Sequence, residues 1–561
     1  MSEAADPPVY LPVPAGELDL NRCRTPGCVN FAVQPQQRTG KGSRGIDDGY
    51  RRVNIAQGRW RNLGLHCLRC GEINTLLSNQ AVAEELARFD ARLATAGFDP
   101  ACSRDGCASQ GIRVTAGPAR YQRFGTTAAG SPRWRCRSCG ATVSAARHGG
   151  LRLRQPEKTE VVLQLLVNKM PMRRMVEVAG VAPKVLYERI GRLARQCRAF
   201  AEHHERRFLE MAYFKRLHVN VDRQDHSLNW GIALERRPIA LRAVATAEIR
   251  TGYILAQHVN YDEEADPRAL ELLAREVGDP GLRPGYRRYA RLWLPHETEG
   301  EDGGGTDAQL RIPPTGAIVH EQYTMAAHIL SLKRWFDRAD AGQFSLDQEP
   351  GLDRMCMLAF AERIKAGDID ACFIKIDKSL TVNQRKTAIA EAQLQLSEQR
   401  KLQPDVPDSE IIRKLMLRQW IVAKAAMPGL RARPWVAHPY PTMGEPRKSV
   451  QILTDDGQRP PEQIAAALAR ASLRAVDRYF MQVRRKINLL ERPIYTSGSH
   501  FRAWYGYSAY SPRVVTEVLE IFRTIYNFHL AGDDGKTPAQ RLGIVAEQVP
   551  LATICAFSPH A

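Results

Sequence analysis

The stretch Cys67-Leu-Arg-Cys70 returns later in the chain as Cys136-Arg-Ser-Cys139, and each copy follows another cysteine pair with four intervening residues. Eight of the twelve cysteines therefore repeat one pattern. Four thiolates presented by two tight knuckles are the ligands that a tetrahedral structural Zn²⁺ requires. The sequence predicts two zinc ribbons, each holding one Zn²⁺. The predicted ligands are Cys23, Cys28, Cys67 and Cys70 in the first and Cys102, Cys107, Cys136 and Cys139 in the second.

The other cysteines do not belong to this pattern. Their scattered positions are typical of apolar packing; they are Cys197, Cys356, Cys372 and Cys555. His66 adjoins Cys67 and is an alternative zinc ligand, but the repeated thiols favour cysteine. Disulfides are not expected, because the chain starts with an acidic stretch that lacks the apolar core of a signal peptide. No stretch approaches the ~20 apolar residues of a membrane span.

Length and charge limit the class of protein. With 561 residues the chain is too long for one core, so three or more domains are expected. The net charge is +19, with arginines gathered in patches such as "RWRCRSC" and "QVRRKIN". Such a charge favours a polyanionic partner, because binding releases counterions from a phosphate backbone. Together with the zinc ribbons, it indicates nucleic acid.

Residues 155–215 have helical periodicity. We expect a short helix over 172–178, a turn at 179–181 where Gly180 allows the tight bend, and a second helix from 182 or 183 to about 199. This layout is typical of a helix-turn-helix, whose second helix enters the major groove of DNA. A plain helical hairpin is the alternative. The side chains of the second helix expected to contact DNA are Lys184, Tyr187 and Arg192.

From residue 215 the apolar period changes to two. In "RLHVNVD" (216–222) alternate apolar residues share one face, and Asp222 lies on the polar face. Two strands follow in "IALRAVATAEI" and "YILAQHVNY", joined by the turn "RTG". A helix over 325–335, a strand ending at Asp347, a helix over 350–365 and the strand "CFIKID" come next. Hairpin-ordered strands followed by alternating helix and strand predict an RNase H-like mixed sheet.

The remaining chain is expected to be mostly helical. Residues 382–428 have helical composition, 430–458 are expected to be irregular, and 460–492 are expected to form one long helix. A last helix is expected over roughly 511–529.

Three carboxylates are candidates for a catalytic site. They are Asp222, Asp347 and Glu491, the last at the end of the helix expected over 460–492. In an RNase H-like sheet the two strands are neighbours and a C-terminal helix crosses their polar ends, so the three could converge. Shared carboxylates hold two Mg²⁺ ions for in-line phosphoryl displacement. Each also has an ordinary structural role as a turn, cap or ion-paired residue. Competing positions are Asp225 for the first, Asp353 or Asp377 for the second, and Glu517 or Glu520 for the third.

A zinc ribbon, a helix-turn-helix and an RNase H-like core in this order resemble the bacterial insertion-sequence transposases of the DDE type. The resemblance covers roughly residues 100–548, and the first ribbon is interpreted as a duplication. It implies that Asp222, Asp347 and Glu491 are the catalytic triad and bind Mg²⁺ or Mn²⁺. Asp347 and Glu491 are 144 positions apart, more than the compact spacing typical of the family, so an insertion over 380–458 is expected. The matching stretches are "RYQRFGTTAAGSPRWRCRSCGATVS", "MPMRRMVEVAGVAPKVLYERIGRL", "LHVNVD", "FSLDQEP", "INLLERP" and "IFRTIYNFHLAGDDGKTPAQRLGI".

Further DNA contacts are expected near the triad. Arg484 and Asn488 precede Glu491 by seven and three residues, so one helix would place all three on one face. His500 and Arg502 belong to an aromatic, glycine- and serine-rich loop and could clamp a DNA backbone or stack on a flipped base. The aromatic residues of this loop are equally typical of a protein core.

The sequence therefore predicts a multidomain DNA transposase. It would bind the terminal inverted repeats of its element and a target duplex, as a homo-oligomer, because two ends must be paired. No membrane partner is expected, and the location would be cytoplasmic, on the bacterial nucleoid when DNA is bound. The alternatives are a non-catalytic DNA-binding regulator, an inactive relic and a nuclease of the same fold. The predicted segments are a disordered start (1–20), zinc ribbon 1 (21–75), a helical linker (76–98), zinc ribbon 2 (99–146), the helix-turn-helix (150–212), an α/β RNase H-like core (213–379 and 459–548) and a largely helical insertion (380–458).

Overall fold

The computed structural model describes residues 9–36, 49–57, 60–94, 100–114, 117–127, 132–144, 155–228, 239–298, 312–349, 351–427, 429, 431–491, 494–495, 503–504 and 509–557. They form two compact units. The first comprises Met1–Leu86 and Tyr213–Phe480, and the second comprises Ala87–Ala212 and Met481–Ala561.

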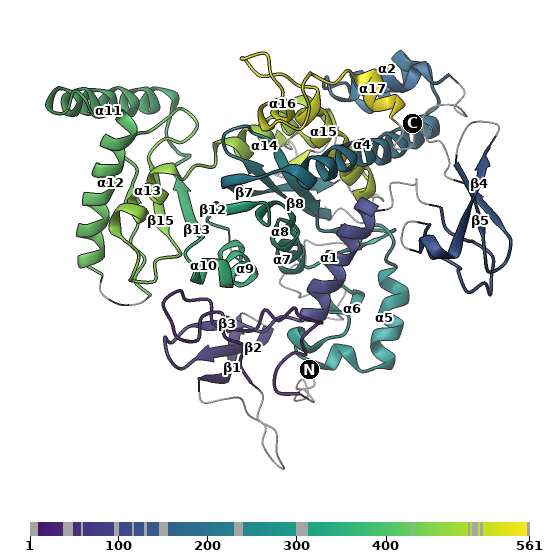
Figure 1. The fold of residues 1–561 in the computed structure, drawn as a ribbon, viewed down its shortest axis with the longest axis horizontal. Coiled ribbons are helices and arrows are strands. Elements are labelled where there is room, and N and C mark those ends of the chain that lie inside the picture. Colours follow the sequence, from purple (N-terminus) through teal and green to yellow (C-terminus); the bar gives the residue numbers. More distant parts are fainter. Residues whose placement is uncertain are drawn as a thin grey trace, which may run out of the picture. The chain divides into compact units, whose positions relative to one another are not determined.

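A seven-stranded mixed sheet forms the centre of the first unit (Figure 1), with the order β14-β15-β13-β12-β7-β8-β9. The strands β7, β8 and β9 form the antiparallel meander that the sequence predicts. Strand β12 runs parallel to β7 and to β13, and β15 is antiparallel to β13. The bounds are β7 (Phe214–Leu228), β8 (Ile239–Glu248), β9 (Ile254–Val259), β12 (Ala339–Asp347), β13 (Ile369–Ile376), β14 (Val436–Ala437) and β15 (Lys448–Ile452).

One face of this sheet is apolar. Leu217 and Val221 of β7 are 1% and 0% exposed, as the alternation predicts. On β12, Phe344 packs against Phe336 and Phe360 of the helices on this face, with ring centroids 4.6 and 5.1 Å apart. Fully burying one such side chain contributes about 1.5–3 kcal/mol, so this face anchors the sheet. The helix expected over 325–335 and the helix expected over 350–365 are each divided into two. The helices are α7 (Glu321–Ser331), α8 (Lys333–Phe336), α9 (Leu352–Ala359) and α10 (Ala361–Lys365).

The other face is polar and is covered by α13 (Pro461–Arg470) and α14 (Arg474–Lys486). The single helix expected over 460–492 is therefore wrong. Ala471 is extended and ends α13, and the backbone at 471–473 bonds to buried polar side chains, so the helical hydrogen bonds are interrupted. After α14 only the short turn η4 (Asn488–Leu490) follows.

The segment between β13 and β15 contains the expected helices, α11 (Val382–Leu402) and α12 (Asp408–Ala425). Residues 430–458 were also expected to be irregular. This is wrong at Val436–Ala437 and Lys448–Ile452, which form β14, at the edge of the sheet, and β15, beside it. Alternate residues of β15 pack on the sheet core, with Val450 and Ile452 0% and 1% exposed. The segment thus completes the sheet.

Residues between β9 and α7 form a small polar-cored lobe. Glu297 lies at its centre, with Arg287 at 2.6 Å, the Leu294 N–H at 3.1 Å and His320 at 3.5 Å. Burial raises the pKa of Glu297, but His320, Arg287 and the Leu294 N–H outweigh it and lower the pKa to about 2. The elements are β10 (Tyr261–Asp262), α5 (Pro267–Glu276), η2 (Asp279–Gly281), η3 (Pro284–Tyr286), α6 (Pro295–Thr298) and β11 (Ala317–Ile318).

The second unit is mainly helical. The turn between α3 and α4 is confirmed, with Gly180 in the left-handed region at φ 59°. Helix α4 was expected to end near 199 but continues to Met211, because its second half is buried against α15. The ring centroids of Phe200 and Phe528 lie 5.1 Å apart, and Glu205 forms an ion pair with Arg523. Helix α15 matches the expected last long helix. The bounds are α2 (Glu157–Leu166), α3 (Met172–Ala179), α4 (Pro183–Met211), β16 (Ile494–Tyr495), β17 (Ala503–Trp504), α15 (Pro512–Phe528), α16 (Pro538–Leu542) and α17 (Leu551–Ala556).

Two small three-stranded sheets belong to the cysteine-rich segments. The first consists of β1 (Tyr50–Gln57), β2 (Trp60–Cys67) and β3 (Ile73–Thr75), followed by α1 (Asn79–Ala94). The second consists of β4 (Tyr121–Thr126), β5 (Pro132–Cys136) and β6 (Thr142–Ser144), preceded by η1 (Pro118–Arg120). Among the described residues, no helix has the length and apolar character that crossing a membrane requires.

Candidate functional site

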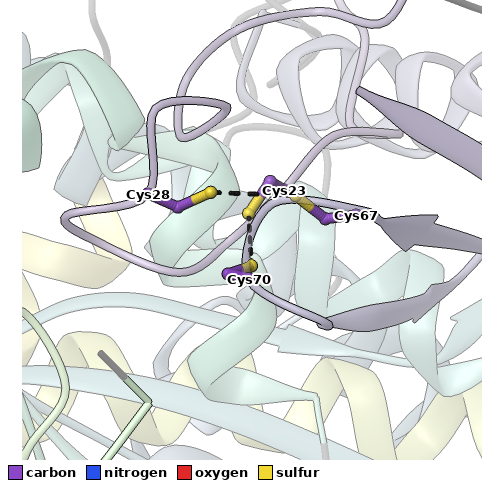
Figure 2. Close-up of side chains that lie close together, drawn as sticks. All are labelled: Cys23, Cys28, Cys67 and Cys70. Carbon is purple, nitrogen blue, oxygen red and sulfur yellow. Dashed lines mark hydrogen bonds between the residues drawn. The ribbon is translucent and has the colours of Figure 1, made fainter. Parts of the chain in front are cut away.

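Each cysteine-rich segment gathers its four sulfurs into one cluster. Within each set the Sγ atoms all lie within 4.8 Å of one another (Figure 2 shows the first). The closest pairs are 3.5 and 3.7 Å apart in the first cluster and 3.5 and 3.8 Å in the second. Four sulfurs at the usual 2.3 Å from a tetrahedral Zn²⁺ lie about 3.8 Å apart. The two sets of four cysteines therefore could hold zinc, as predicted; His66 is not in the first set.

Backbone N–H groups point at these sulfurs. The N–H of Asn30 donates to Cys28 Sγ at 3.4 Å, and that of Ser109 to Cys107 Sγ at 3.4 Å. At Cys28 desolvation and neighbouring thiols outweigh the Asn30 N–H and raise the pKa. At Cys136 desolvation raises the pKa, but the N–H groups of Cys139 and Ser138 outweigh it and bring the pKa to about 6. Donors of this kind stabilise thiolate, which is the form that binds metal.

The two modules repeat each other in three dimensions. The tyrosine that begins the first strand, Tyr50 or Tyr121, pairs with the third cysteine of its module. Its hydroxyl accepts a hydrogen bond from the N–H of the first cysteine, at 3.2 Å in the first module and 2.9 Å in the second. The first cysteine in turn bridges to the residue eight positions later, Phe31 or Gln110. These shared details agree with the interpretation of a duplication.

The first module is packed into the sheet-containing unit through buried charges. Arg24 contacts Glu72 of the module at 2.8 Å and Asp353 of α9 at 3.0 Å. Arg354 of α9 is buried and donates to the carbonyl oxygen of Thr75 in β3. The module thus lies against the helix that starts five residues after Asp347.

The second module carries an arginine-rich sheet face. Between residues 100 and 144 there are seven arginines and one carboxylate. Phe124 is 45% exposed, and the guanidinium carbons of Arg133 and Arg135 lie 5.6 and 5.5 Å from its ring centroid. Neither arginine forms an ion pair with a carboxylate within the described part of the chain.

Asp222 and Asp347 lie at adjacent positions of the sheet. Strand β12 pairs with β7 so that Leu346 lies opposite Val221, and Asp347 is the last residue of β12. The two aspartates therefore occupy the next rung on the polar face. Asp222 is buried and accepts the Arg223 N–H at 2.7 Å.

A third carboxylate, Asp477, interacts electrostatically with Asp222 and Asp347, and the sequence analysis did not predict it. Asp477 lies in the first turn of α14, where its N–H donates to the Leu473 carbonyl oxygen at 3.0 Å. It hydrogen-bonds to Asp222 and interacts with Asp347. A signal was present: Asp477 is the one acidic residue among five basic residues in "RAVDRYFMQVRRK". The prediction of one continuous helix over 460–492 instead placed the third carboxylate at the C-terminal end of that helix, at Glu491.

Burial and mutual repulsion disfavour the charged form of these carboxylates. Burial raises the pKa of Asp222 well above its ordinary value, and Asp347 and Asp477 raise it further, against the Arg223 N–H and Lys378. Burial also raises the pKa of Asp477, which Lys378 opposes. Carboxylates held together in this way are suited to hard divalent cations. Their oxygens are not gathered as closely as the thiols: in the described residues, only the two cysteine sets have all ligand atoms within 4.8 Å.

Glu491 has a different environment. It follows η4 in the second unit, its side chain is 46% exposed, and it pairs with Lys169 at 3.0 Å. The competing carboxylates have local partners as well. Asp225 lies near Arg223, Asp353 pairs with Arg24, Asp377 accepts from Ser379, Glu517 pairs with Arg513, and Glu520 pairs with Arg198.

The expected DNA contacts are only partly described. On α4, Lys184 and Tyr187 are exposed and Arg192 is half-buried, as a surface for a ligand requires. Arg484 is half-buried near the end of α14, and Asn488 lies in η4. The helix expected to align these two with Glu491 therefore ends before Asn488. His500 and Arg502 lie outside the described residues.

Comparisons of the chain with protein-family models, with curated proteins and with solved structures found no match.

Proposed function

We propose that the chain is a DNA-cleaving and DNA-joining enzyme of the transposase class, in which Asp222, Asp347 and Asp477 hold divalent metal ions. The observation that carries the proposal is the meeting of these three carboxylates on two adjacent parallel strands and one crossing helix. A protein that only binds DNA gains nothing from placing two further carboxylates beside the buried Asp222, which they repel.

The strand order supports an RNase H-like reading of the sheet. The meander β9-β8-β7 followed by the parallel strands β12 and β13 is the order expected for that fold, and β15 and β14 extend its edge. An acidic residue within the first strand and another at the end of the strand beside it are where the resemblance puts the first two aspartates. We assign the third position to Asp477, and Glu491 stays a prediction that the experiment below also tests.

The proposed reaction is phosphoryl transfer at the element end. Water attacks a phosphorus, the P–O3′ bond breaks, and the released 3′-oxygen takes a proton. That 3′-hydroxyl then attacks a phosphorus of the target, whose own 3′-oxygen leaves with the proton. Mg²⁺ or Mn²⁺ would activate the attacking oxygen and stabilise the leaving one. Asp222, Asp347 and Asp477 would hold the ions, and Lys378 would balance the residual charge.

DNA binding is assigned to two surfaces of the second unit. The exposed side chains of α4 can approach a major groove as in a helix-turn-helix. The Phe124, Arg133 and Arg135 face of the second cysteine module offers two guanidinium groups and an aromatic ring to a phosphate backbone. Pairing of two element ends implies a homo-oligomer on DNA.

The test is metal-dependent cleavage of a labelled duplex carrying the element ends. We expect Mg²⁺ or Mn²⁺ to support nicking by the wild type. Asp222→Asn and Asp477→Asn should each reduce the rate at least a hundredfold with DNA binding retained. Glu491→Gln distinguishes the third ligand, and Asp225→Asn is a control carboxylate on the same strand. Binding without cleavage across many end sequences would instead identify a regulator or a relic.

A further inference from the structure

A row of buried polar side chains lies one rung away from the carboxylates. Asn220 and Ser345 stand opposite each other on β7 and β12, two residues before Asp222 and Asp347. Both are 0% exposed. Because side chains alternate along a strand, these two share the polar face with the aspartates.

This row bonds to the chain that leads into α14. The Asn220 amide donates to the Ser472 carbonyl oxygen at 3.1 Å, and the Ser472 N–H donates to Ser345 Oγ at 3.4 Å. Five residues after Ser472 the chain reaches Asp477. Strands β7 and β12 therefore hold, by hydrogen bonds, the residue that lies just before the helix carrying the third carboxylate.

A buried ion pair from the segment before α13 holds the same point. Glu445 accepts the Ser472 hydroxyl at 2.8 Å and the Leu473 N–H at 2.6 Å. Lys448 donates to Glu445 at 3.0 Å and to the Ala471 carbonyl oxygen at 2.8 Å. Glu445 and Lys448 are 5% and 6% exposed. Hydrogen bonds from buried side chains thus hold the backbone at Ala471, Ser472 and Leu473 in place.

Energetics argue for a positioning role. Replacing a buried ion pair with neutral groups of similar size is often neutral or stabilising, so such a pair is weak evidence for stability alone. Glu445 and Lys448 bond to residues 471–473, directly before α14, and Ser472 of this stretch bonds to both strands. The N–H of Asp477 in turn bonds to Leu473. A shift of the helix start would move Asp477 away from Asp222 and Asp347.

We propose that Glu445 and Lys448 are positioning residues that fix the start of α14 so that Asp477 completes the metal site. This inference rests on the proposed function and assigns a role within the same site to the segment expected to be an insertion. It predicts that metal affinity depends on two residues that do not touch the metal.

The test is Mn²⁺ binding to the full chain, followed by electron paramagnetic resonance in the absence of DNA, together with Mg²⁺ titration of cleavage. The double variant Glu445→Gln/Lys448→Met keeps the side-chain volumes and leaves no buried charge unpaired. We expect its Mn²⁺ affinity at the carboxylate site to fall at least tenfold. The half-saturating Mg²⁺ for cleavage should rise by a similar factor, with DNA affinity unchanged.

Lys424→Met/Asp455→Asn is the matched control. It removes another ion pair with a buried carboxylate from the same segment, at 2.7 Å, and should leave metal affinity unchanged. Ser472→Ala removes the hydroxyl that donates to Glu445 at 2.8 Å and accepts the N–H of Arg474, the first residue of α14, at 3.1 Å. It is the second variant if the double variant does not fold. It should weaken Mn²⁺ binding severalfold.

The outcomes separate the two proposals. If Asp222→Asn and Asp477→Asn leave Mn²⁺ binding unchanged, the carboxylate site itself is refuted. If those variants abolish binding while Glu445→Gln/Lys448→Met and Ser472→Ala bind Mn²⁺ as the wild type does, the positioning role is refuted and the metal site stands.

Discussion

Replacing Asp222 with asparagine should stabilise the protein when divalent metal ions other than bound zinc are absent. Burial and two neighbouring carboxylates raise the pKa of Asp222 well above its ordinary value. The folded state therefore holds the proton more tightly than the unfolded state, and ionisation at neutral pH opposes folding. The ionised carboxylate therefore lowers the free energy of unfolding at high pH, by about 1.4 kcal/mol for each unit by which folding raises the pKa. Asparagine removes this cost and keeps the oxygen that accepts the Arg223 N–H at 2.7 Å.

The assay is urea unfolding at several pH values, followed through the fluorescence of the buried Trp335 in the same unit. We expect Asp222→Asn to raise the free energy of unfolding at pH 8, by about 1.4 kcal/mol for each unit by which folding raises the pKa of Asp222. The gain should shrink as the pH falls below the raised pKa of the folded state, and it should vanish below about pH 3.8, where the wild-type carboxyl group is protonated in both states. Added Mg²⁺ should stabilise the wild type and not the variant, since only the wild type binds it fully.

The control is Asp225→Asn on the same strand, whose side chain is 58% exposed and lies 3.4 Å from Arg223. It should not be stabilised. An Asp222→Asn protein that is less stable than the wild type at pH 8 without Mg²⁺ would refute the reasoning, because Asp222 would then be a satisfied structural residue.

Three further predictions concern other parts of the chain. Cys70→Ser should lower the thermal midpoint of the sheet-containing unit, measured by calorimetry, because the first module packs against α9 of that unit. The equivalent Cys139→Ser should leave that transition in place, because the second module belongs to the other unit. Glu297→Gln should lower the free energy of unfolding by about 3 kcal/mol at pH 7, because folding lowers the pKa of Glu297 from 4.5 to about 2. This contribution is complete above about pH 4.5 and is lost as the pH falls through 2. Urea unfolding at pH 7 and pH 2.5 should therefore show a smaller difference between the variant and the wild type at the lower pH. Arg133→Ala and Arg135→Ala should each weaken binding to any duplex and reduce the slope of log affinity against log salt by about 0.9 per lost phosphate contact; an unchanged slope would exclude this face.

The local patterns predicted much of the fold. The cysteine spacing predicted both sulfur clusters, and the period-two alternation before Asp222 predicted the buried and polar faces of β7. Such signals depend on residues that are near in sequence. The strand ending at Asp347 was equally clear, because an acidic residue interrupts an apolar run.

What was missed depended on long-range contacts. The break at 471–473 is made by side chains from Asn220, Ser345 and Glu445, which lie far away in sequence. Helical periodicity is continuous across this break, so the sequence favoured one helix and placed the third carboxylate at its distal end. Strand β15 was missed for a similar reason, because five residues of alternation are too few to distinguish from a loop.

The packing of the first cysteine module against α9 has a consequence for the cell. Metal binding that occurs only in the folded state adds to folding free energy by mass action. In a module without contacts to its neighbours, metal binding would stabilise only the module. Here the contacts of Arg24 and Arg354 transmit this stabilisation to α9, the helix that follows Asp347. The supply of free zinc during synthesis would then set how much of the sheet-containing unit reaches its native state. Zinc starvation would then lower the abundance of the folded protein.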